Sequence, residues 1–287
     1  MSQELLSGTS DAAAAAQDMA AKAGGENFPV ALRLLPAHQR EHLMAVYGFA
    51  RMTDDLGDCG PVQGRLQLLD ELEADLGRLA GGSPQRAEVR ALRPVVSQCS
   101  VPLQLFADLI QANRQDQVVA RYQSFDDLLG YCRLSADPVG RIVLHVFGAY
   151  TAQRAELSDR VCSALQLAEH WQDVAEDLRA GRIYLPREDL DAFGCTESDL
   201  AAPAAGAQVR ALMAFETRRA RALLSAGAPL VGSLRGFARL AVGGYVAGGR
   251  AALAAIGAAD HDVLSGTPRP ARRRLAVELL RAVVTGR

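Results

Sequence analysis

Apolar residues recur at helical spacing along most of this chain. Leu43, Val46, Tyr47 and Ala50 follow an i, i+3, i+4, i+7 pattern, which is the pattern of one helix face. Hydrophobic residues make up 49% of the chain and aromatic residues only 5%. This balance favours close-packed helices over a β-sheet, in which β-branched and aromatic residues dominate. Since nothing in the 287 residues is typical of a linker between independent halves, we expect a single all-α domain.

Glycine, proline and capping residues divide this pattern into separate helices. Ser124 followed by Asp127 predicts a helix start, and Pro138 with Gly140 predicts a break in the helix that follows. Residues 1–24 lack the basic flank and leucine-rich core of a secretory signal, so we expect a flexible tail before a helical domain over 25–287. The expected helices cover about residues 37–58, 66–79, 88–98, 102–117, 124–136, 141–150, 158–178, 208–226 and 231–257, with a turn-rich connection over 185–195 and an arginine-rich segment over 269–287.

Three acidic residues in the second half of the chain stand four positions apart. In a helix, Glu169, Asp173 and Asp177 lie one above another on a single face, with side-chain roots roughly 5–6 Å apart. Gly181 and Pro186 end this helix just after the acids. Like charges at such spacing repel one another, so the arrangement favours a bound cation.

A second acidic pair, Asp54 and Asp58, shares a helix face one turn after Arg51. Either group alone is more often a solvated helix surface. Both, however, follow apolar segments, and carboxylates that enter an apolar wall are costly unless they are paired or bind a metal. We therefore expect two helices to face one another around Mg²⁺. Because Mg²⁺ is held by one or two carboxylates per ion together with phosphate oxygens, the expected ligand is a diphosphate.

Three groups of residues, met in chain order, resemble the squalene/phytoene synthase family. They are Glu26-Asn27-Phe28-Pro29 with Leu34-Leu35-Pro36, Tyr47 to Arg51 with Asp54 to Asp58, and Gln172-Asp173 to Asp177 with Gly181 to Pro186. The resemblance covers about residues 26–270. Within the family, the opening motif and Trp171-Gln172-Asp173 are most similar to the hydroxysqualene synthase branch of bacterial hopanoid synthesis.

This resemblance implies an isoprenoid synthase fold, a single-domain helical bundle with a central cavity. It implies Mg²⁺ held by catalytic Asp54, Asp58, Asp173 and Asp177, with Glu169 as a further metal ligand. The residues implied for substrate binding are Asn27, Phe28, Tyr47, Arg51, Gln172, Tyr184 and Tyr245. Two of these positions depart from the family pattern, since Glu169 stands where asparagine is usual and Gln172 stands where many members have arginine.

The implied activity is that of a lyase that acts on a prenyl diphosphate. Presqualene diphosphate would ionise, its carbocation would rearrange, and water would capture it to give hydroxysqualene. Two alternatives share the fold. One is a transferase that condenses two farnesyl diphosphates head to head into presqualene diphosphate. The other is a non-catalytic assembly factor whose aspartate motifs have decayed, against which the four aspartates argue.

A different metal chemistry has one formal match in the chain. His38-Gln39-Arg40-Glu41-His42 satisfies the HxxEH pattern of a zinc peptidase. It falls at the start of a helix, and no third ligand is obvious. Surface histidines therefore explain the pattern well.

Charge and cysteine content exclude several classes of partner. A net charge of -2 provides no field for nucleic acid. The five cysteines form no CxxC pair, so we expect a reducing, cytoplasmic compartment. Arginines interrupt the apolar region over 223–259, which leaves no uncharged run of the ~18–20 residues that a spanning helix needs. The cluster Arg269, Arg272, Arg273 and Arg274 fits either contact with anionic lipid at a membrane surface or a solvated terminal helix.

Overall fold

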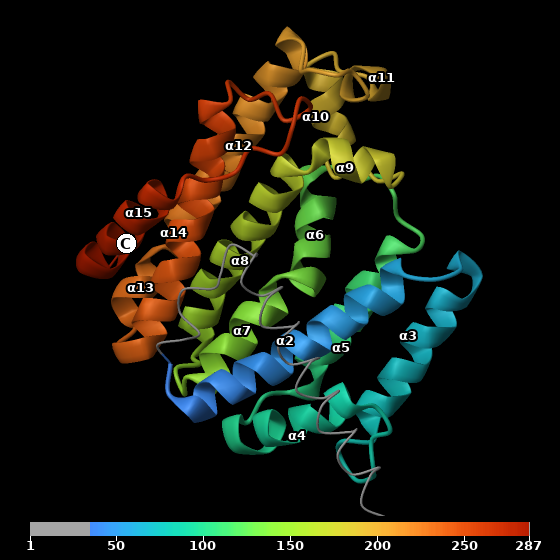
Figure 1. The fold of residues 1–287 in the computed structure, drawn as a ribbon, viewed down its shortest axis with the longest axis vertical. Coiled ribbons are helices and arrows are strands. Elements are labelled where there is room, and N and C mark those ends of the chain that lie inside the picture. The colour runs from blue at the N-terminus through green and yellow to red at the C-terminus, as the bar shows by residue number, and fades with distance from the viewer. Residues whose placement is uncertain (1–34, 287) are drawn as a thin grey trace, which may run out of the picture.

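The computed structural model describes residues 35–286, and these residues form helices joined by short connections (Figure 1). The expected tail over 1–24, and with it Asn27 and Phe28, lies outside the described residues. Within 35–286 there is no β-strand, only an isolated bridge between Arg121 and Ile183. The helices are α2 (Ala37–Asp58), α3 (Val62–Gly77), α4 (Ala87–Cys99), α5 (Leu103–Asp116), α6 (Phe125–Ser135), α7 (Asp137–Val146), α8 (Ala152–Gln172), α9 (Val174–Arg179), α10 (Arg187–Ala192), α11 (Glu197–Leu200), α12 (Ala207–Gly227), α13 (Pro229–Ser233), α14 (Gly236–Ala258) and α15 (Arg272–Thr285).

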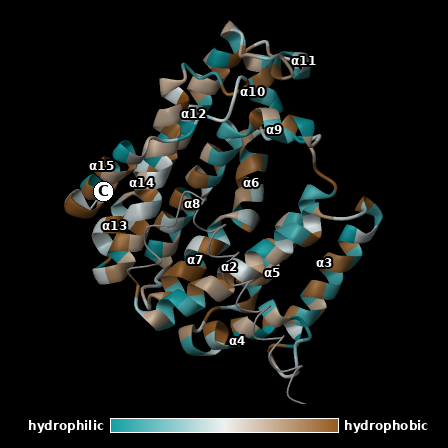
Figure 2. Cartoon of the chain, in the orientation of Figure 1, coloured by the Kyte–Doolittle hydropathy of each residue, from teal (hydrophilic) through white to brown (hydrophobic). Residues whose placement is uncertain are grey.

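The helices pack around two adjoining hydrophobic cores. Helices α2 to α5 form one side of the molecule, α8 and α12 to α15 form the other, and α6 and α7 lie between them (Figure 1). In the first core, the rings of Phe49 and Phe106 meet edge-on at 5.3 Å. The second core surrounds the fully buried Trp171. Figure 2 shows apolar and polar residues alternating along α3, as expected for a helix with one buried face.

Several local predictions are confirmed. The helix expected over 37–58 has these bounds in the structure. The Ser124 hydroxyl accepts a hydrogen bond from the Asp127 amide, and the Asp127 carboxylate accepts one from the Ser124 amide, so α6 begins with a capping box. A break is present, but it lies at Ala136 rather than at Pro138 and Gly140, so α7 covers Asp137–Val146 instead of the expected 141–150.

Four other predictions about helix extent are wrong. The helix expected over 158–178 starts earlier, at Ala152, because Thr151 accepts a hydrogen bond from the Arg154 amide and caps it. The same helix is interrupted at Asp173, whose φ of -106° and ψ of 16° leave the helical region. The connection over 185–195 contains the short helix α10, which begins directly after Pro186. The pattern over 231–257 divides into α13 and α14, because Leu234 and Arg235 are extended.

Helix α14 is long and apolar enough, by length and composition, to cross a membrane, which the sequence interpretation did not expect. It contains two charged residues, Arg239 and Arg250. Of its apolar stretch, 61% is buried inside the molecule, where it packs on α8, α12 and α15. Burial in the core accounts for its apolar composition.

Candidate active site

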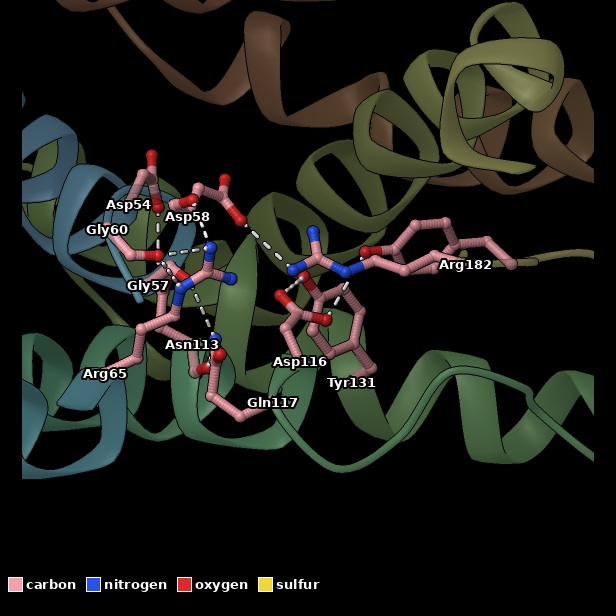
Figure 3. A network of polar contacts seen from close by, with 11 residues as sticks. Asp54, Gly57, Asp58, Gly60, Arg65, Asn113, Asp116, Gln117, Tyr131 and Arg182 are labelled. Atoms are coloured by element: carbon pink, nitrogen blue, oxygen red, sulfur yellow. Dashed lines mark hydrogen bonds and ion pairs between the residues drawn. The ribbon is translucent and has the colours of Figure 1, made fainter. Parts of the chain in front are cut away.

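The first acidic pair lies on the last turns of α2, where this helix crosses α5. Gly57 separates Asp54 from Asp58, and a Cβ atom at this glycine would come within 2.4 Å of the Asn113 amide oxygen. The close approach lets Asn113 donate a hydrogen bond to Asp54 at 3.1 Å (Figure 3). Gln117 donates to the Gly57 carbonyl at 3.0 Å. The sequence Asp-Asp-Leu-Gly-Asp therefore fixes the acids against α5.

This close approach gives a testable stability difference. Gly57→Ala should destabilise the protein by about 1–2 kcal/mol, since the added methyl group must displace the Asn113 side chain. A matched control is Gly64→Ala in α3, where nothing lies within 4 Å of the added carbon. The control should stabilise the protein by roughly 0.5–1 kcal/mol, because alanine favours helix. Urea unfolding would measure both, and a stabilising Gly57→Ala would contradict the predicted contact.

The second acidic group lies where α8 passes into α9. Although the helix is interrupted at Asp173, its amide still donates to the Glu169 carbonyl at 3.0 Å, and the Asp177 amide donates to the Asp173 carbonyl at 2.8 Å. The helical spacing of the three acids is therefore retained through the break. Gly181, with φ of +82°, then ends α9, and the Arg182 amide donates back to the Asp177 carbonyl at 2.8 Å.

Carboxylates in both groups lack full charge compensation. Burial, and next the charge of Asp173, raise the pKa of Asp177 to about 7. The Asp54 side chain is exposed, yet partial loss of hydration beside α5 raises the pKa of its carboxyl group to about 6 despite the hydrogen bond from Asn113. Burial also raises the pKa of Asp116, at the end of α5, to about 6. Such carboxylates favour an added cation.

Arg182 lies between the two acidic groups. Its guanidinium forms an ion pair with Asp58 at 3.1 Å, and its positive charge lowers the pKa of both Asp116 and Asp177. The backbone beside it is fixed, because the Ile183 amide donates to the Ala120 carbonyl at 3.0 Å. One cation thus interacts with carboxylates from three separate helices, as Figure 3 shows for Asp58 and Asp116.

An aromatic group lies on the other side of Arg182. The Tyr184 ring stacks on His170 with centroids 3.6 Å apart. Tyr131 and Tyr184 both donate to Asp116, at 2.7 Å and 3.3 Å. Burial and the charge of Arg182 lower the pKa of His170 to about 3, so its imidazole is neutral.

A small pocket opens beside these rings. Its volume is about 10 Å³, which is space for about one water molecule. The predicted central cavity, large enough for a prenyl chain, stays a prediction. The pocket is lined by His170, Val174, Asp177, Ile183, Tyr184 and Leu185.

The other predicted site residues are more dispersed. Arg51 is exposed and forms an ion pair with Asp55 at 2.9 Å. Gln172 is buried, and its amide donates to the Pro268 carbonyl, in the segment before α15. The half-buried Tyr245, on α14, packs against the first core. Tyr47 is half-buried on α2, and Glu169 is exposed at the end of α8. Their roles in binding stay predictions, as do those of Asn27 and Phe28.

Three residues that the structure places at this site were not selected from the sequence: Asn113, Asp116 and Arg182. Arg182 lies inside the motif Gly181 to Pro186, so its position directly after the helix-ending glycine could have identified it. Asn113 and Asp116 stand in a polar helix end with no unusual spacing. Only the packing of α5 against α2 brings them to the acids.

The donor set suits Mg²⁺ bound together with a substrate. Among residues 35–286, no group of three or more His, Cys, Asp or Glu side chains could hold a metal ion. A zinc site needs three or four protein ligands, and His42 instead contacts the Cys99 sulfur at 3.3 Å. Mg²⁺ needs only one or two carboxylates when phosphate oxygens supply the rest. The pairs Asp54 with Asp58 and Asp173 with Asp177 fit this second case.

The raised pKa of Asp177 predicts a dependence of stability on pH. Its folded pKa of about 7 exceeds the ordinary value, so the folded state binds more protons and stability falls as pH rises from about 4 to 7. Without metal, Asp177→Asn should therefore raise the melting temperature at pH 8 by about 2–4 °C, with a smaller gain at pH 5. Thermal unfolding in a chelator would test this. An equal gain at both pH values would show that the Asp177 charge is not responsible.

Comparison with known proteins identifies the family of this chain. The chain matches the family model described as squalene/phytoene synthase over residues 21–281. It is 36% identical over 215 residues to a hydroxysqualene synthase from Sinorhizobium fredii, a match that covers 74% of this chain and 72% of that protein.

Solved structures share the helical arrangement. The crystal structure of a squalene synthase from Alicyclobacillus acidocaldarius superposes with a TM-score of 0.78 at 40% identity, covering 86% of this chain and 93% of that one. A dehydrosqualene synthase in complex with a ligand gives a TM-score of 0.84 at 24% identity, covering 94% and 95%. The second likeness concerns the fold alone.

Proposed function

Because the chain belongs to the squalene/phytoene synthase family, we propose that it converts presqualene diphosphate to hydroxysqualene. Members of this family process prenyl diphosphates, and the resemblance predicted from the motifs is confirmed. The observation that carries the proposal is the placement of Arg182 between Asp58 and Asp177. Two acidic groups that are more than a hundred residues apart in the sequence therefore both interact with the Arg182 guanidinium.

In this reaction the chain's own residues bind and orient the diphosphate. Asp54 and Asp58 on one side, and Asp173 and Asp177 on the other, would hold Mg²⁺. When bound, Mg²⁺ acts as a Lewis acid that makes the diphosphate a better leaving group. Arg182 adds a fixed positive charge beside the departing oxygens. The carbon–oxygen bond breaks, and its electron pair leaves with the diphosphate.

The remaining cation needs surroundings that stabilise positive charge and limit water. Aromatic faces stabilise cations by roughly 0.5–2 kcal/mol each, and Tyr131 and Tyr184 present such rings beside Asp116. Water then attacks the rearranged cation, forms the new carbon–oxygen bond and loses a proton. The one-water pocket lined by His170 and Asp177 offers space for such a water next to the second acidic group.

Product analysis separates this activity from its alternatives. The purified chain would be incubated with Mg²⁺ and either presqualene diphosphate or farnesyl diphosphate. Hydroxysqualene from the first substrate, without presqualene diphosphate from the second, supports the proposal. Accumulation of presqualene diphosphate would establish the head-to-head condensation instead. If neither substrate released diphosphate, a non-catalytic role would replace both.

A further inference from the structure

Helix α15 carries an apolar stripe that faces away from the molecule. Val277, Leu280 and Val284 are 65%, 67% and 69% exposed. Leu280 and Val284 stand three and seven positions after Val277, so all three side chains share one helix face. The opposite face is buried, since Ala282 has no exposed surface and Arg239 of α14 donates to the Val283 carbonyl at 2.5 Å. The helix is therefore amphipathic, with its inner face seated on α14.

Arginine side chains flank this stripe. Arg273 and Arg281 stand four residues before and after Val277, so each lies within about 40° of it around the helix axis. Both are exposed, as is Arg274. Among the described residues, none of the three has a carboxylate within ion-pair distance, whereas the exposed Arg51 and Arg187 each form an ion pair. Glu278, the carboxylate of this helix, is half-buried, and its charge acts on Arg250 of α14. The outer face of α15 therefore combines apolar area with a net positive charge.

We propose that the outer face of α15 docks on the surface of an anionic lipid bilayer. An interfacial helix inserts its apolar stripe at the level of the headgroups, while basic residues beside the stripe meet lipid phosphates. A second copy of this chain fits the face less well. A two-fold contact would place the arginines of one α15 against those of the other, and like charges repel.

Docking here would bring the bilayer close to the acidic site. The segment before α15 contacts the α8–α9 junction, because the Thr267 hydroxyl donates to the Glu176 carboxylate at 3.5 Å and the Gln172 amide donates to the Pro268 carbonyl. Helix α15 begins three residues after Arg269, which is at most about 10 Å of extended chain. Under the proposed function, an apolar product would leave next to lipid. The docking itself does not depend on that reaction.

Vesicle flotation of the full chain tests the docking. Wild type should float with vesicles of phosphatidylcholine and phosphatidylglycerol at least tenfold more than with phosphatidylcholine alone, and added salt should weaken this binding. The triple variant Val277→Ser, Leu280→Ser, Val284→Ser should bind the anionic vesicles at least tenfold less than wild type does. The variant Arg273→Gln, Arg274→Gln, Arg281→Gln should lose both binding and its salt dependence. A Val284→Trp variant should show a blue shift of emission on anionic vesicles.

The matched control is Val62→Ser, Leu66→Ser, Val118→Ser, which changes three other exposed apolar residues and should bind as wild type does. Equal binding by wild type and the α15 variants would overturn the proposal, as would no binding to anionic vesicles. Self-association that the serine variant abolishes, without vesicle binding, would assign the face to a second copy. Because melting temperatures and diphosphate release are measured on the same variants, failure of the docking is distinguishable from failure of the proposed reaction.

Discussion

Replacing either Asp54 or Asp177 by asparagine is expected to lower the rate of diphosphate release by about 10³-fold. Asparagine retains the shape of the side chain but removes the charge with which a carboxylate binds Mg²⁺. Asp54 comes from α2 and Asp177 from α9, so equal losses would show that both acidic groups serve one reaction. The measurement is single-turnover release of diphosphate from presqualene diphosphate at saturating Mg²⁺.

The control for this prediction is Asp191→Asn. Asp191 is exposed and pairs with Arg187 along α10 at 2.9 Å, and its replacement should leave the rate unchanged. Because residues that act as a unit are not additive, the double variant of Asp54 and Asp177 should lose little more than either single variant. A single variant that keeps a tenth or more of the wild-type rate would remove that residue from the metal site.

Arg182→Gln should lower the same rate by about 10²-fold, because removing one fixed donor beside a developing anion has an effect of this order. The loss should persist at saturating Mg²⁺, since a free ion cannot replace the guanidinium of Arg182. The backbone next to Arg182 is held in place by the hydrogen bond from the Ile183 amide to the Ala120 carbonyl. Arg182→Lys should recover part of the rate, because it keeps the charge but not the planar donor fork. Steady-state kinetics with presqualene diphosphate would measure these changes.

Arg179→Gln is the matched control for Arg182. Arg179 is exposed at the end of α9 and donates to the Ala175 carbonyl at 3.0 Å. It lies three residues from Arg182 but interacts with no acid of the site in an ion pair. An equal loss for both variants would indicate that net charge near α9, rather than the position of Arg182, determines the rate.

The helices could be predicted because their signals are local. Apolar spacing predicted α2 over its full length, and Ser124 with Asp127 predicted the start of α6. The break at Asp173 was not predicted, because the acids and the apolar residues keep helical spacing across it, and the Asp173 and Asp177 amides still donate four residues back. The dihedral angles of Asp173 leave the helical region, and the Glu176 amide donates only three residues back, to the Asp173 carbonyl. The spacing of the side chains in the sequence gives no sign of this interruption of the helix.

The acidic residues of the site could also be predicted, since their four-residue spacing is visible in the chain. Their neighbours could not, because Asn113 and Asp116 reach the site through long-range packing of α5. Gly57 shows the limit of sequence reasoning. The sequence shows a glycine between two aspartates, but only the structure shows why a glycine is needed there. A Cβ atom at position 57 would lie within 2.4 Å of the Asn113 amide oxygen. The same holds for Gln172, which contacts the Pro268 carbonyl.

Acidic groups from α2 and from the α8–α9 junction are expected to bind divalent metal together with a diphosphate. Mn²⁺ titration with inorganic diphosphate, followed by electron paramagnetic resonance, tests it without any turnover. Two double variants, Asp54→Asn with Asp58→Asn and Asp173→Asn with Asp177→Asn, should each weaken Mn²⁺ binding at least tenfold. Wild-type Mn²⁺ affinity in either double variant would contradict it.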